Sequence, residues 1–151
     1  MKIIGEAVQN ELAEVTDHGV AMSKNGNPQV WVKFKFVDIM EASDEEVGIT
    51  AYLSLSEAAF PYTMEKLTNL GWIGISISNL DRTAEPCDNL VGHTVRISVA
   101  MEEYEGKVTP KVSFINHKDY TGGPAKIDPK EAKILDSKLK GKIAAYRAKG
   151  K

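Results

Sequence analysis

Apolar and polar residues alternate along five stretches of the chain, which is the pattern of strands with one buried and one exposed face. The clearest stretch is residues 29–38, where Val30, Val32, Phe34 and Phe36 fall on one face. The predicted strands cover about residues 12–22, 29–38, 47–55, 91–101 and 107–116. Residues 23–28, with their Asn-Gly pair, and the Glu-Gly pair at 105–106 predict hairpin turns.

The period changes between the third and fourth strands. Phe60, Met64 and Leu67 are four and three residues apart, which is the spacing of a helix face. Pro61 falls in the first turn, where its missing amide does no harm, and Gly71 stands where a helix would end. We therefore predict one helix here, followed by an irregular stretch over residues 72–86.

The order strand, strand, strand, helix, strand, strand is that of an OB-fold barrel. We predict an all-β, five-stranded OB-fold barrel with one helix between strands three and four. Another small barrel or a β-sandwich fragment is the alternative. An acidic loop over residues 41–46 joins the second and third strands.

The C-terminal part of the chain has a different pattern. Gly122-Gly123-Pro124 predicts a linker, and Asp128, Pro129 and Glu131 predict the start of a helix. One apolar stripe and one basic stripe follow at helical spacing: Ala132, Leu135, Leu139, Ile143 and Tyr146, and Lys133, Lys140 and Arg147. We expect a basic amphipathic helix, with folding only on contact with a partner as an alternative.

Charge divides the chain at the same place. The net charge of the 151 residues is -2. Residues 119–151 hold nine Lys+Arg and four Asp+Glu, a net +5, which leaves ten and seventeen, a net -7, for residues 1–118. The sequence thus predicts a domain over residues 1–118 and a linker with a basic tail over residues 119–151.

The composition bounds the class of protein. A hydrophobic fraction of 42% suits a domain with a buried core, and Cys87 has no second cysteine to pair with. Residues 1–6 do not resemble a signal peptide, and no window approaches the roughly 20 apolar residues of a membrane span. We expect a soluble cytoplasmic protein that does not contact a membrane.

The exposed face of the second predicted strand carries the candidate chemistry. Trp31, Lys33 and Lys35 alternate with the apolar residues there. An indole gives a surface on which a base can stack, and lysines attract phosphates, so the combination favours a single-stranded nucleic-acid binder. The alternative for Trp31 is packing beneath the C-terminal helix or a loop.

Five further residues are candidates for the same site. Tyr52 would extend the stacking surface if its strand register matches that of Trp31. Tyr104 and Lys24 lie in the two hairpin loops that flank the groove of an OB fold. Lys107 and Lys111 would line that groove, or are ordinary solvated lysines. The acidic neighbours of Tyr104 would repel phosphate, which disfavours a binding role for this residue. The residues around Lys24 are also explained by ordinary turn preferences alone.

Catalysis has little support in the sequence. The three histidines, His18, His93 and His117, are isolated, and a single cysteine cannot give zinc-site spacing. There is no Gly-rich phosphate loop with a lysine. We expect no enzyme activity, no cofactor and no metal, with Trp72 in the core and Arg96 in a structural ion pair.

Several segments carry a resemblance. They are residues 13–17 (AEVTD), 23–30 (SKNGNPQV), 70–72 (LGW), and 102–107 (EEYEGK) leading to 111–116 (KVSFIN). In this order, over roughly residues 10 to 116, they resemble a family of small phage-encoded single-stranded DNA-binding proteins. The resemblance implies an OB fold and protection of single strands during phage replication or recombination.

The chain departs from that family at two places. The third strand tends to be richer in aromatics than residues 49–53, which offer only Tyr52. Many single-strand-binding proteins end in an acidic tail that recruits replication proteins, whereas residues 146–151 are basic. Direct DNA contact or self-association of the tail is the expectation instead.

The predicted function is non-sequence-specific binding of single-stranded DNA in phage replication or recombination. The first alternative is an OB-fold interaction module that binds a replication, recombination or host-defence protein through its acidic surface. The second is a recombination accessory factor whose basic tail contacts duplex DNA. Replication or recombination proteins and a second copy of the chain are open as partners.

Overall fold

The structure is a computed structural model that describes residues 1–40, 45–120 and 129–149. The chain forms two compact units, Met1–Thr121 and Gly122–Lys151, and each is described by itself. The first unit is mostly β, and the second contains a helix. The predicted acidic loop lies largely outside the described residues, as do the predicted linker and the predicted cap at Asp128.

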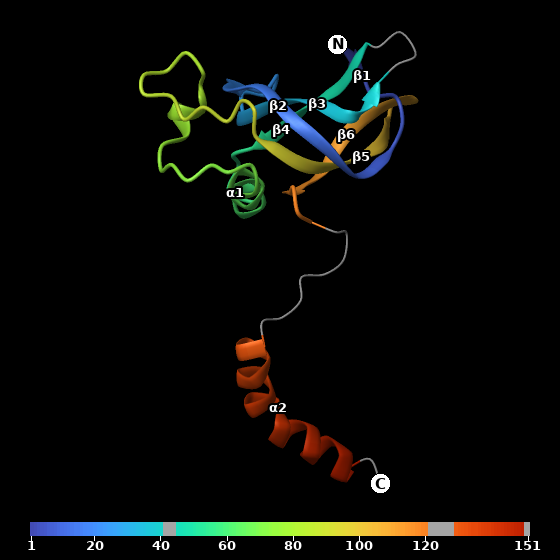
Figure 1. The fold of residues 1–151 in the computed structure, drawn as a ribbon, viewed down its shortest axis with the longest axis vertical. Coiled ribbons are helices and arrows are strands. Elements are labelled where there is room, and N and C mark those ends of the chain that lie inside the picture. The colour runs from blue at the N-terminus through green and yellow to red at the C-terminus, as the bar shows by residue number, and fades with distance from the viewer. Residues whose placement is uncertain (41–44, 121–128, 150–151) are drawn as a thin grey trace. The chain divides into compact units, whose positions relative to one another are not determined.

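The first unit is built on one curled sheet, in which the strands wrap toward a half-barrel (Figure 1). Its strand order is β1-β4-β3-β2-β5-β6. The pairs are antiparallel, except that β1 runs parallel to β4. The strands are β1 (Lys2–Ile3), β2 (Val8–Met22), β3 (Pro28–Met40), β4 (Glu46–Ser54), β5 (Thr94–Tyr104) and β6 (Lys107–His117).

The prediction of five strands was wrong by one. The additional strand, β1, has two residues, which pair with Val47 and Gly48. A segment this short cannot display the period of two that identifies a strand in a sequence. The longer strands lie close to their predicted ranges.

The beginnings of two strands differ from the prediction for local reasons. β2 begins at Val8 rather than near residue 12, because an irregularity between Val8 and Glu11, with Asn10 at φ 54°, interrupts the alternation. β5 begins at Thr94 rather than at residue 91, because the chain turns there through Gly92, which has a φ of 92°.

The core lies on the inner face of the sheet. Val30, Val32, Phe34 and Phe36 are all buried, as the alternation predicts. Burial of each such side chain contributes about 1.5–3 kcal/mol relative to exposure. Trp72 is also buried, at 5% exposure, and its indole N–H donates to Asp88 Oδ2 at 2.9 Å, so its predicted place in the core is confirmed.

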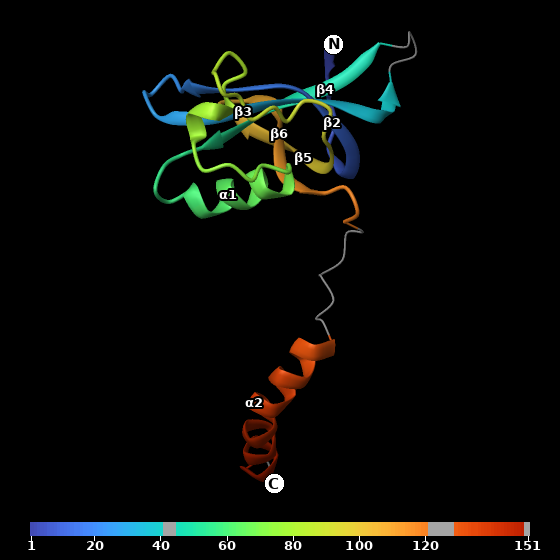
Figure 2. The ribbon, with the colours of Figure 1, turned by 60° about the vertical axis from the view of Figure 1, so that its left-hand side comes forward.

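Helix α1 (Phe60–Asn69) lies beneath the sheet and contacts β4 and β6 (Figure 2). Leu67 is fully buried on the side that faces the sheet. At the end of the helix, Gly71 adopts a φ of 94°, and the Trp72 N–H donates to the Leu67 carbonyl at 3.0 Å. This is a Schellman ending, which needs a residue that tolerates positive φ.

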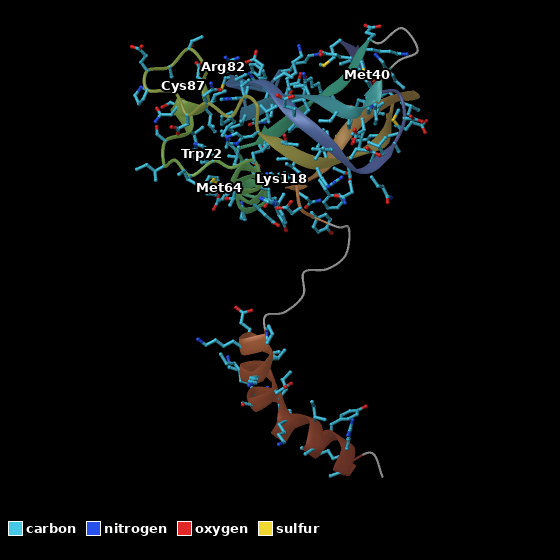
Figure 3. The ribbon with its side chains drawn as sticks, viewed as in Figure 1. Met40, Met64, Trp72, Arg82, Cys87 and Lys118 are labelled. Carbon is cyan, nitrogen blue, oxygen red and sulfur yellow. The ribbon has the colours of Figure 1, made fainter. Side chains whose placement is uncertain are left out.

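A long loop follows α1 and includes a short 3-10 helix, η1 (Ile77–Leu80). Figure 3 labels Trp72, Arg82 and Cys87 along this loop. His18 fastens the loop to β2, because His18 is 1% exposed and contacts it twice. Its Nδ1 lies 2.6 Å from the Leu80 carbonyl oxygen, and its Nε2 accepts a 2.9 Å hydrogen bond from the Leu90 N–H. The neutral tautomer with the proton on Nδ1 satisfies both contacts.

The same loop contains the one described carboxyl group with a clear pKa shift. The backbone N–H and the hydroxyl of Thr83 both donate to Asp81, at 2.9 and 2.7 Å. These bonds stabilise the charged form and hold the pKa of Asp81 below its usual value. They fix a local turn and lie apart from the residues predicted to bind a ligand.

The second unit contains helix α2 (Pro129–Lys149), in which no residue is buried. Its segregation of apolar from polar residues is modest, because Ile134 and several alanines lie outside the predicted apolar stripe. Among the residues described, no helix combines the length and the apolar character that crossing a bilayer requires.

Candidate nucleic-acid interface

Three strands bring one row of residues together on the outer face of the sheet. Trp31 on β3 pairs with Gly19 on β2 and with Tyr52 on β4. Paired residues project to the same face, so the two aromatic side chains are neighbours. Tyr52 is 63% exposed and Trp31 is partly exposed. Tyr52 would extend the stacking surface only if its strand paired in register with Trp31, and this is the register observed.

Gly19 provides the support on which the indole lies. A Cβ atom at this position would stand 2.7 Å from Trp31 Cζ2 and 2.8 Å from Nε1. The ring thus packs directly against the backbone of β2. This contact with the sheet sets the position of the indole. It also explains why Trp31 is partly buried, so the predicted alternative, in which a loop or the C-terminal helix covers the ring, is not needed.

The next row adds positive charge beside the aromatic pair. Lys33 pairs with Asp17 on one side and Thr50 on the other, and its side chain is exposed. Among the described residues, no carboxylate forms an ion pair with Lys33. Its ammonium group is therefore available to a phosphate.

Arg82 contributes a second cation to this row. Its guanidinium donates to Asp17 Oδ1 at 3.1 Å and is partly exposed. Asp17 lies directly across from Lys33, so Arg82 reaches the same area of the surface. Sequence reasoning missed this residue, because it lies in a stretch with no periodicity and 65 residues from its partner.

Lys35, one row further along β3, has a different environment. Its ammonium lies 3.6 Å from the carboxylates of both Glu14 and Glu46. Two carboxylates surround one lysine, so the local charge is negative and a phosphate would have to compete with both. Lys35 is therefore a poorer candidate for phosphate contact than its place in the alternation predicts.

A hollow next to Tyr52 joins β4 to the β5–β6 hairpin. It has a volume of about 220 Å³ and is lined by Thr50, Tyr52, Glu102, Thr109 and Lys111 among others. The curl of the sheet thus brings together Tyr52 and Lys111, which lie far apart in the sequence. The Lys111 ammonium pairs with Glu102 at 3.4 Å, and both side chains are exposed, so this pair is weak.

The tip of the β5–β6 hairpin carries the next candidates. Tyr104 pairs with Lys107 across the turn, and both are exposed, Tyr104 to 74%. Counting back along the register, they share a face with Lys111. Glu105 and Gly106 form the turn with φ values of 51° and 78°.

Lys24 lies at the β2–β3 turn and is exposed. Two backbone hydrogen bonds define the turn, from Ser23 N–H to the Asn27 carbonyl at 2.8 Å and from Gly26 N–H to the Ser23 carbonyl at 2.9 Å. Gly26, with a φ of 79°, supplies the conformation that the turn needs. Among the hydrogen bonds and ion pairs of the described residues, none joins Lys24 to the rows of Trp31 and Lys33.

Arg96 differs from its prediction. Instead of an ion pair, its side chain donates to two backbone carbonyl oxygens, those of Lys118 at 2.9 Å and Asn10 at 3.1 Å. These acceptors lie within reach because β2 and β6 flank β5. Arg96 therefore has a structural role, as predicted, but its partners are backbone atoms. Within the described ranges, no group of three or more metal-ligating side chains gathers.

Comparison with known proteins gives no independent guide to this surface. No protein-family model matches the chain, and no curated protein matches it.

Proposed function

We propose that the protein binds single-stranded DNA without sequence preference, as a non-enzymatic OB-fold protein of phage replication or recombination. The observation that carries the proposal is the row formed by Gly19, Trp31 and Tyr52 on the outer face of the sheet. Two neighbouring aromatic side chains are partly open to solvent there, next to Lys33, which pairs with no carboxylate of the described residues. Such a surface suits bases joined by phosphates.

The strand pairing supports an OB-type barrel. β2 lies between β3 and β5, β4 follows β3, and β6 follows β5. Helix α1 comes between β4 and β5 in the chain, and β4 and β6 are in contact. In OB folds, oligonucleotides bind to the face formed by the second and third barrel strands and to the loops that flank it. The corresponding strands here are β3, which carries Trp31, and β4, which carries Tyr52.

The chemistry of binding follows from the rows. Bases would stack on Trp31 and Tyr52. The single-stranded DNA would then continue along the hollow toward Lys111, Tyr104 and Lys107. Lys33 would contact a phosphate beside the aromatic pair, and Arg82 would do so in competition with its partner Asp17. Because flat faces and phosphates are common to all sequences, this arrangement predicts little sequence preference.

A titration tests the proposal. The probe is a labelled dT oligonucleotide of about 30 bases, which is long enough for several binding sites. Its fluorescence anisotropy is measured at low salt, and a labelled duplex is titrated in parallel. We expect tight binding to the single strand, weaker binding to the duplex, and a loss of affinity as salt rises. Binding to neither would contradict the proposal and would favour the protein-interaction alternative.

A further inference from the structure

Helix α2 exposes a narrow apolar seam, made of Ala132, Leu135, Leu139, Ile143 and Tyr146. At 100° per residue, these five side chains fall within about 40° of a common line along the helix. The four larger ones are exposed by 37–79%. A stripe of this width is typical of a helix–helix seam and is narrower than the apolar face of a helix packed on a broad core.

Positive charge borders the seam on both sides. By the same geometry, Lys138, Lys142 and Lys149 flank one side together with Glu131, and Lys133, Lys140 and Arg147 flank the other together with Asp136. The whole helix holds seven Lys+Arg and two Asp+Glu, a net charge of +5. The surface is thus an apolar line between two borders, each with three basic residues and one acidic residue.

This charge pattern disfavours pairing of α2 with a second copy of itself. In a parallel pair the two different borders meet, and in an antiparallel pair each border meets its own copy. Both arrangements oppose mainly lysines and arginines across the seam. Like charges at these flanking positions are repulsive, so the seam fits a partner whose borders are acidic.

Two other classes of partner fit less well. Phosphates satisfy the lysines of a nucleic-acid-binding helix but gain nothing from Leu135, Leu139 and Ile143 between those lysines. A membrane-surface helix needs a wide apolar face opposite a strongly polar one. The back of α2 instead carries small residues such as Gly141, Ala144 and Ala148.

We infer that α2 is a docking helix for a partner protein that offers an apolar groove bordered by carboxylates. Its seam would lie in the groove, and its basic borders would pair with the acidic rims, as in other helix-in-groove complexes. Within the second unit, none of the described residues of α2 is buried, so the helix does not use the seam for a contact inside that unit. The inference is independent of DNA binding by the first unit.

The experiment uses the full chain and a defined probe. The probe is a fluorescent synthetic helical hairpin whose leucine-lined groove is bordered by glutamates. Two control hairpins carry lysines in place of the glutamates or serines in place of the leucines. We expect the acidic leucine hairpin to bind by anisotropy and each control to bind at least about tenfold more weakly.

Matched variants locate the contact on α2. Leu135→Ala with Leu139→Ala should weaken binding of the acidic leucine hairpin by about tenfold or more. Ile134→Ala removes an aliphatic side chain that is 53% exposed but lies about 140° from the seam, and it should change binding by less than about twofold. Alanine preserves helix propensity in both.

Four results would overturn the inference. The first is no binding of the acidic leucine hairpin. The second is equal binding of the serine hairpin, since general electrostatic attraction would then suffice. The third is equal sensitivity to Ile134→Ala and to the seam variant. Vesicles of phosphatidylglycerol or duplex DNA that bind tightly through Leu135 and Leu139 would instead assign the seam to those partners and also contradict it.

Discussion

The indole of Trp31 rests on Gly19, and this contact leaves no room for a larger residue beneath it. A Cβ atom would lie 2.7 Å from the ring, closer than carbon atoms approach in proteins. An indole is rigid, so it would have to move. The position of the proposed stacking surface therefore depends on a glycine one strand away.

Gly19→Ala should weaken binding of the dT oligonucleotide. The displaced indole would lose part of its stacking geometry, so we expect a loss of affinity of up to about 150-fold, which corresponds to complete loss of one stacked base. Anisotropy measures the affinity, and the thermal midpoint reports whether the fold is retained. A folded variant with native affinity would show that the position of the indole is unimportant for binding.

His18 is a second residue whose role depends on distant partners. It joins β2 to both ends of a loop segment through the Leu80 carbonyl and the Leu90 N–H. In His18→Ala, both buried backbone groups lose their partners, at a cost of about 1–3 kcal/mol each. We expect urea unfolding to show a destabilisation of at least about 1 kcal/mol. A stability equal to that of the native chain would mean that the loop is held by other contacts.

On the scale of one strand, β3 shows what alternation can and cannot predict. The alternation correctly divides the buried phenylalanines and valines from Trp31 and Lys33. It treats Lys33 and Lys35 as equivalent, because both occupy the exposed register. Their difference arises from the neighbouring strands, since Glu14 and Glu46 reach Lys35 from β2 and β4. Pairing between strands is not encoded in the period of any one of them.

This difference gives a prediction for two adjacent variants. Lys33→Ala should remove one phosphate contact and make the slope of log affinity against log salt less steep by about 0.7. Lys35→Ala should leave that slope nearly unchanged, because its ammonium already pairs with two carboxylates. A salt series with the dT oligonucleotide measures both. Equal slopes in the two variants would contradict the assignment of Lys33 to a phosphate.

At the scale of the whole molecule, the sequence predicts the two-part organisation but not what joins distant elements. Turn residues and helix-ending residues such as Asn25, Gly26 and Gly71 act locally, so they are visible in the sequence. The hollow between Tyr52 and Lys111, and the approach of Arg82 to Asp17, depend on how the sheet curls and the loop folds back. These long-range contacts leave no periodic trace.

The division into two units also predicts the effect of removing the tail. Among the described residues, every member of the buried core cluster lies in the first unit, so deletion of residues 122–151 should leave that core intact. We expect an unchanged thermal midpoint and an affinity for the dT oligonucleotide within about twofold of the full chain, since the stacking residues remain. If single-strand binding is lost on deletion, the tail must itself carry the site. Loss of duplex binding alone would assign duplex contact to the tail.

The most direct test of single-strand stacking compares Trp31→Ala with Tyr62→Ala. Tyr62 is an aromatic residue on α1 with 67% exposure that lies outside the Trp31 row, so it controls for the loss of an exposed ring. Stacking contributes about 1–3 kcal/mol per base, so Trp31→Ala should bind the dT oligonucleotide roughly 5- to 150-fold more weakly, while Tyr62→Ala binds as the native chain does. Native affinity in Trp31→Ala, with the fold retained, would contradict the account.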